Sequence, residues 1–216
     1  MVPATASAGS WRATMTYQRS RRDFLLVFTI VFFAGTFGLN IAMSTVLMST
    51  EVFGRGAAAY GVLSSVTAVG SLAGALLAAR RPVTRLRLIV VSAIAFGVLE
   101  VLAGLAPTYL TFALLLPLVG LASLTMVTAA TSYIQLAADA ANRGRVMAAY
   151  TIVFMGGTPL GAPFIGFIGE HAGARWTLLV GGLVTAAAVG VSAVMFHGRV
   201  PRLTVRNLRE TAAAFA

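Results

Sequence analysis

Six long apolar segments, separated by short polar stretches, dominate the hydrophobic pattern of this 216-residue chain. A helix needs about 20 apolar residues to cross a hydrocarbon core of about 30 Å, and each segment is close to that length. Lipid offers no partner to backbone N–H and C=O groups, and the segments do not alternate as barrel strands do, so helices are predicted. The expected spans are residues 24–48, 60–79, 88–106, 110–135, 146–169 and 176–196.

The predicted fold class is therefore an all-α membrane protein with six transmembrane helices. We expect residues 1–23 to form a polar cytoplasmic lead, residues 24–196 the transmembrane bundle and residues 197–216 a basic cytoplasmic tail. The lead does not look like a secretory signal, because the apolar run after it is too long and lacks a convincing cleavage site.

Composition and charge agree with a membrane protein. The chain is 58% hydrophobic and 10% charged, whereas globular proteins average about 45–50% and about 25%. All 16 basic residues are arginines, and they fall in alternate loops; only Arg55 and Arg175 lie on the other side. Basic flanks stay cytoplasmic, which predicts both termini inside a plasma (inner) membrane. The net charge of +10 belongs to this pattern, so no nucleic-acid partner is expected.

Residues for catalysis are missing from the sequence. Cysteine is absent, and His171 and His197 lie far apart without metal-ligand neighbours. Neither a nucleotide-cradling loop nor a Ser/His/Asp set is present. We predict that the protein is not an enzyme and uses no metal and no cofactor.

Polar residues inside two spans form stripes. Successive members lie three or four residues apart, which places them on one helix face. Two facing stripes would line a weakly polar substrate passage; alternatively, Ser and Thr bond to their own helix carbonyls and aid packing. Both interpretations stay open for the two amide side chains, while packing is favoured for the hydroxyls alone. The candidate cavity residues are Thr36, Asn40, Ser44, Thr128, Ser132 and Gln135.

Glu100 is the only carboxylate deep within a span. It follows Leu88 by 12 residues, about 18 Å along a helix, which places it in the outer half of the membrane. An ionised group there costs a few kcal/mol unless it is paired or hydrated. Glu100 is therefore either a proton-coupling site or a protonated or snorkelling side chain near the outer interface. The second interpretation is favoured because no basic residue in the spans could pair with it.

The fifth span is rich in glycine and proline. Pro159 and Pro163 remove helix hydrogen bonds and invite a kink. Gly157 and Gly161 share a helix face and permit close helix approach. Spans interrupted in this way are typical of transporter binding regions. We expect this face to pack and flex against a partner bundle.

Several of these segments resemble a known family. Arg143-Gly144-Arg145-Val146-Met147, followed by the Gly/Pro-rich span, resembles the start of helix 11 in the major facilitator superfamily. The resemblance is to its drug- and siderophore-exporter branch, of the enterobactin-exporter kind. Further segments match in the same order over roughly residues 11–198: Arg21-Arg22-Asp23, Gly35-Thr36-Phe37-Gly38, Ala59-Tyr60-Gly61 and Gly173-Ala174-Arg175. The matching part is the second half of a twelve-helix fold, helices 7 to 12.

The resemblance implies roles for parts of the chain. Helices 7, 8, 10 and 11 of the family face the substrate cavity, whereas helix 9, which matches the span with Glu100, lies outside it. The cytoplasmic gate loops would contain Arg80, Arg81, Arg143 and Arg145. The family often carries a Gly-x-x-x-Asp-Arg latch between helices 8 and 9. Here Gly74 is followed by Ala78-Ala79-Arg80, so a carboxylate latch is not expected.

The function implied is that of the C-terminal half of a proton-coupled exporter of small amphipathic molecules. It would rock against an N-terminal six-helix half, or a second copy, around a midplane cavity. The alternative is a membrane-embedded interaction protein or truncated remnant without transport activity of its own.

Overall fold

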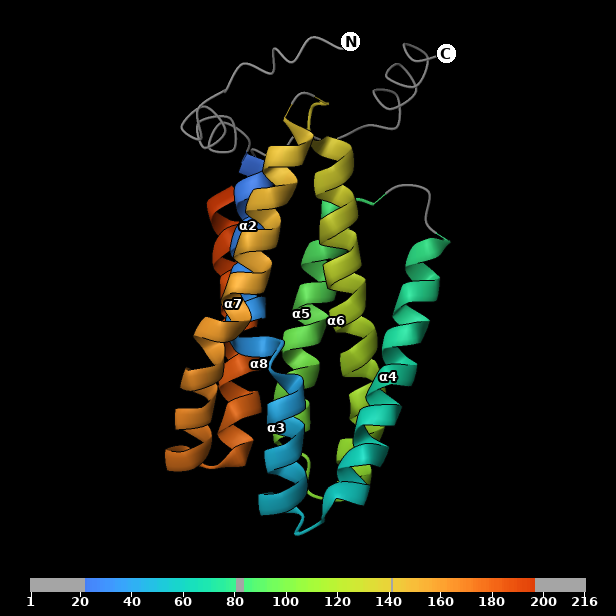
Figure 1. Cartoon of the computed structure of the whole chain (residues 1–216), viewed down its shortest axis with the longest axis vertical. Coiled ribbons are helices and arrows are strands. Elements are labelled where there is room, and N and C mark those ends of the chain that lie inside the picture. Colours follow the sequence, from blue (N-terminus) through green and yellow to red (C-terminus); the bar gives the residue numbers. More distant parts are fainter. Residues whose placement is uncertain (1–21, 81–83, 141, 197–216) are drawn as a thin grey trace, which may run out of the picture.

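Six apolar helical segments cross the molecule in alternating directions (Figure 1). The computed structural model describes residues 22–80, 84–140 and 142–196. The six segments are the first span, Asp23–Val52, and helices α4 (Ala57–Ala79), α5 (Leu86–Gly104), α6 (Tyr109–Ala137), α7 (Arg143–Ala172) and α8 (Ala174–Phe196). The six-helix all-α fold is confirmed. The tail and nearly all of the lead lie outside the described residues.

The first span is broken near its middle. Its parts are α2 (Arg22–Phe33), the π-helix η1 (Ala34–Gly38), α3 (Ile41–Leu47) and a second π-helix, η2 (Met48–Val52). The Leu39 N–H donates to the Ala34 carbonyl at 2.8 Å, five residues back, and Asn40 leaves the helical region with φ −80° and ψ 27°. The Asn40 side-chain amide donates to the Thr36 carbonyl at 2.9 Å. The Asn40 side chain thus supplies the Thr36 carbonyl, next to the break, with a hydrogen-bond donor that lipid could not provide.

Glycines stand where spans cross most closely. A Cβ atom at Gly161 of α7 would collide with the Thr36 carbonyl of η1. In the same way, Gly70 of α4 faces the Pro117 carbonyl of α6, and Gly182 of α8 faces the Gly97 carbonyl of α5. Membrane helices associate through such small-residue contacts because lipid supplies no hydrophobic force between them. These crossings fasten α7 to the first span, α4 to α6 and α5 to α8.

This packing corrects one expectation for α7. The face with Gly157 and Gly161 packs on Gly35 and Thr36 of the first span and does not point toward a partner bundle. The helix runs from Arg143 to Ala172 with both prolines inside it, and the kink expected there stays a prediction. Regular helix is lost in the first span, at Gly38–Asn40, a segment without proline that the hydrophobic pattern presents as a continuous span.

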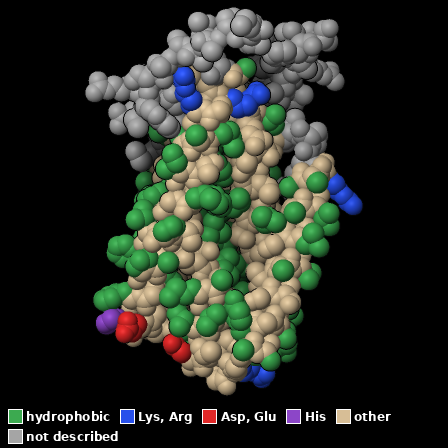
Figure 2. All heavy atoms as spheres, in the orientation of Figure 1, with side chains coloured by type: hydrophobic (Ala, Val, Ile, Leu, Met, Phe, Trp, Pro, Cys, Tyr) green, Lys and Arg blue, Asp and Glu red, His purple; other side chains and the backbone are tan. Residues whose placement is uncertain are grey.

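Polar contacts fix the end of the bundle opposite the start of α2. Arg55 lies 4.4 Å from the centre of the Tyr109 ring, and the Tyr109 hydroxyl donates to the Ala59 carbonyl at 2.8 Å. Arg175 donates to the carbonyls of Gly104 and Ala106 at 3.1 and 2.9 Å, where α5 ends. Both arginines that depart from the charge pattern therefore have structural partners. Figure 2 shows acidic and histidine side chains at this end and several basic ones at the other.

The glycine crossing of α7 with the first span predicts a position-specific effect on stability. Gly161→Ala should lower the free energy of unfolding by about 1–3 kcal/mol, because the new methyl group must displace backbone. Gly156→Ala is the matched control, since a Cβ at Gly156 meets no atom within 4 Å. That change should be neutral or slightly stabilising, as alanine favours helix more than glycine does. Thermal unfolding in detergent measures both, and equal stability of the two variants would contradict the observed packing.

Candidate substrate-binding site

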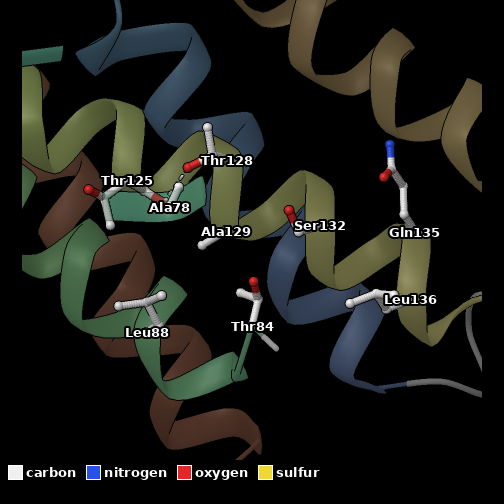
Figure 3. A pocket seen from close by; sticks show the side chains of 9 residues that line it. All are labelled: Ala78, Thr84, Leu88, Thr125, Thr128, Ala129, Ser132, Gln135 and Leu136. Carbon is white, nitrogen blue, oxygen red and sulfur yellow. Dashed lines mark hydrogen bonds between the residues drawn. The ribbon is translucent and has the colours of Figure 1, made fainter. Parts of the chain in front are cut away.

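A cavity opens between α4, α5 and α6 at the end of the bundle where α2 begins (Figure 3). Its volume is about 200 Å³. The lining residues are Ala78, Thr84, Leu88, Thr125, Thr128, Ala129, Ser132, Gln135 and Leu136. Three of the predicted cavity residues, Thr128, Ser132 and Gln135, therefore lie at one hollow. They do so because they follow one face of α6 at helical spacing.

The cavity lining is polar but uncharged. Thr128 donates its hydroxyl to the Leu124 carbonyl at 2.6 Å, and the Thr125 carbonyl also lies within reach at 3.2 Å (Figure 3). The Thr125 hydroxyl is buried without a hydrogen-bond partner. Leu88 and Leu136 supply apolar surface beside these groups. Such a lining can hold an apolar body and accept or donate a few hydrogen bonds, and it offers no charge to select an ion.

Arginines border the cavity on one side. A second hollow, lined by Arg85, Arg87, Leu88 and Val91, shares Leu88 with the first. Arg85 and Arg87 are both exposed, as are the predicted gate residues Arg80 and Arg143. Arg145 is half-buried, and Arg81 lies outside the described residues.

The predicted first-span residues do not reach the cavity. Thr36, Asn40 and Ser44 are buried in the bundle, with exposed fractions of 4%, 8% and 2%. Thr36 lies under Gly157 and Gly161, and Asn40 bonds to the first span itself. The structure thus does not bring the two polar stripes together to line one passage. The first-span stripe packs at the break and at the crossing with α7. Residue spacing shows only that these side chains share one helix face, so it cannot distinguish this packing role from a role in lining a cavity.

Several lining residues were not predicted from the sequence, among them Ala129 and Leu136 on α6 and three residues from outside α6. Ala78, Thr84 and Leu88 come from the end of α4, the connection after it and the first turn of α5. Their only signal was proximity to the basic loop at residues 80–87. Thr125 precedes Thr128 by three residues and so lies on the same face of α6.

Glu100 lies apart from the cavity. It is 1% exposed and occupies the last turns of α5, 12 residues beyond Leu88. A Cβ at Gly38 of the first span or at Gly181 of α8 would touch its carboxyl oxygens. The suggestion that this side chain snorkels to the interface is wrong, because α8 and the first span cover it.

One family matches nearly the whole chain. The family model for the Major Facilitator Superfamily matches residues 24–215. The chain belongs to the Major Facilitator Superfamily. Members of this superfamily are transporters rather than enzymes, and the six apolar helices agree with an assignment to membrane transport. A search of curated proteins found no match. Among the described residues, no group of three His, Asp or Glu side chains is placed to hold a metal ion.

The different burial of the two stripes predicts different accessibility to water. Single cysteines can be introduced at will because the chain has none of its own. Ser132→Cys should react with a water-soluble maleimide in the folded protein, since residue 132 lines the cavity. Thr36→Cys should react only after unfolding, because α7 covers that position. Similar labelling rates at both positions in folded protein would show that the first stripe also faces water.

Proposed function

We propose that this chain forms one six-helix bundle of a proton-coupled exporter of small amphipathic molecules. The observation that carries the proposal is the uncharged cavity beside α6, with hydroxyl and amide groups next to leucine and alanine. At about 200 Å³ it is smaller than the about 300–1,000 Å³ of ligand pockets. The cavity then supplies part of a substrate site, and a second bundle supplies the rest.

The orientation we infer places the cavity at the cytoplasmic side of a plasma (inner) membrane. At the end where α2 begins, the described residues include Arg80, Arg85, Arg87 and Arg143, whereas the other end carries Arg55 and Arg175. Basic residues near span ends are retained in the cytoplasm. Both termini are then cytoplasmic, and an exported molecule enters the cavity from inside the cell.

The least covered helices support a second bundle. Of the six spans, α4 and α7 have the smallest buried share. Both expose hydroxyl groups as well as apolar side chains: Ser65, Thr151 and Thr158 are exposed. A hydroxyl suits a partner helix or a watered path better than lipid, even when it bonds to a backbone carbonyl. We infer that an N-terminal six-helix half or a second copy covers part of this surface.

Transport would follow from rigid movement of one bundle against the other. The glycine crossings join α4 to α6, α5 to α8 and α7 to the first span by direct backbone contact. Packed cores change between discrete arrangements and do not deform continuously. The bundle can therefore rock as a unit and open the path from the cavity alternately to each side, as transporters of repeated architecture do.

Cysteine labelling in intact cells tests the orientation. Position 57 opens α4 at the outer end, and position 85 precedes α5 at the inner end; both are exposed. A membrane-impermeant reagent should label Ala57→Cys and leave Arg85→Cys unlabelled. Permeabilised cells provide the control, in which both positions should react. Labelling of position 85 alone in intact cells would reverse the orientation.

Filling the cavity tests the transport role. Ser132→Phe should reduce proton-driven ethidium uptake into everted vesicles by at least about tenfold, equivalent to about 1.4 kcal/mol of lost binding. Leu183→Phe is the matched control, because Leu183 is exposed on the outer surface of α8. Equal uptake by the two variants would remove the cavity from the substrate path. If the wild-type chain adds no uptake even when an N-terminal six-helix half is co-expressed in the vesicles, a membrane protein without transport activity becomes the better account.

A further inference from the structure

A group of buried oxygen atoms at the break of the first span has no role in the cavity. Among the described residues, five buried side-chain oxygens lack a hydrogen-bond partner. Three of them lie at or next to the break: Thr36 Oγ1, Glu100 Oε2 and Thr185 Oγ1. Glu100 and Thr185 are 1% and 0% exposed. Buried polar atoms are nearly always paired, so an unpaired cluster calls for an explanation.

Two glycines lie where the Glu100 carboxyl, the Thr185 hydroxyl and the Phe37 carbonyl approach one another. A Cβ at Gly38 would lie 3.1 Å from Glu100 Oε2 and 3.0 Å from Thr185 Oγ1. A Cβ at Gly181 would lie 3.0 Å from Glu100 Oε1 and 2.8 Å from the Phe37 carbonyl oxygen. The Thr185 hydroxyl therefore lies on the Oε2 side of the carboxyl group, without a hydrogen bond to it, and the Phe37 carbonyl lies on the Oε1 side. Both glycines must stay small for α5, α8 and the first span to meet here.

The charged groups on the three elements around Glu100 lie at their ends. They are Arg87 on α5, Arg22, Asp23 and Glu51 on the first span, and Arg175 on α8. Arg175 is ten residues from Thr185, about 15 Å along α8. Its guanidinium donates to the carbonyls of Gly104 and Ala106 beyond the carboxyl. Glu100 itself lies near the negative end of the α5 dipole. Among the described residues, its immediate surroundings thus offer a backbone carbonyl and a hydroxyl, and no cationic side chain.

A carboxyl group in these surroundings needs a proton. The protonated form has an O–H that can donate to the Phe37 carbonyl, an acceptor that a carboxylate cannot use. A carboxylate would face that carbonyl oxygen without a cation and away from water, which is a costly arrangement. The element best able to move and admit water is the first span, since its backbone is already irregular from Leu39 to Asn40.

We propose that Glu100, Thr185 and the Phe37 carbonyl form a proton-binding site that controls the break of the first span. With the proton bound, the carboxyl donates a hydrogen bond and the break stays packed against α8. When the proton passes to water, the charged carboxylate is hydrated and α3 swings away from α8. The site is separate from the substrate cavity; its role as the coupling site rests on the proposed function, whereas its chemistry does not.

Electron paramagnetic resonance can measure this movement in the full chain in lipid vesicles. Spin labels at Ala42→Cys in α3 and Leu183→Cys in α8 occupy exposed positions on the two elements. Their separation should increase by several ångström between mildly acid and mildly alkaline pH. A control pair, Val62→Cys in α4 and Leu118→Cys in α6, should keep its separation. No transport takes place in this experiment, so its result and the failure of the proposed function are distinguishable.

Carboxyl variants identify the responsible group. Glu100→Gln should hold the labels at the acid-pH separation throughout, because the amide is neutral and can still donate. Glu51→Gln, which neutralises an exposed carboxylate on the same span, should keep the full pH response. An unchanged response in Glu100→Gln, or a pH-independent separation in the otherwise unmodified chain, would overturn the proposal. An equal change in label separation on adding sodium at constant pH would also overturn it. The otherwise unmodified chain tests that outcome even if Glu100→Gln fails to fold.

Discussion

The first span cannot be interrupted inside a membrane unless protein covers the interruption. Backbone carbonyls exposed to lipid cost several kcal/mol each, and the segment from Ala34 to Asn40 departs from regular helical bonding. The structure meets this constraint with one amide side chain and two neighbouring helices. Asn40 bonds to the Thr36 carbonyl, while α7 and α8 close over the break with glycines at the contact points.

Much of the helix arrangement in the bundle follows from the need to cover this break. Because Gly157 and Gly161 serve the break, the glycine face of α7 is already occupied and cannot be the surface that meets a partner bundle. Because α8 must also approach, it packs along α5 through Gly97 and Gly182 and encloses Glu100. The remaining helix, α4, is attached to α6 near its middle through Gly70 and leans away toward the end where α2 begins (Figure 1). The cavity lies at that end, between α4, α5 and α6.

Properties that depend on one helix at a time could be predicted from the sequence. Length and hydropathy located the six spans, and the α6 stripe identified Thr128, Ser132 and Gln135 as cavity residues. Properties that depend on neighbours could not be predicted. Thr36 has the spacing of a cavity residue, but α7 covers it. Glu100 lies in the outer half of its span and could have been expected to reach the interface, yet α8 and the first span enclose it. The break itself contains no proline to mark it.

Hydrogen exchange of the backbone amides at residues 35–41 tests the cover of the break most directly. The chain would be placed in lipid nanodiscs at mildly acid pH and compared with the connection between the first span and α4, residues 53–56, as an internal reference. If α7 and α8 cover the break, these amides exchange much more slowly than the reference although part of the segment lacks regular helix. Exchange as fast as that of residues 53–56 would show that water reaches the break, and would contradict this account.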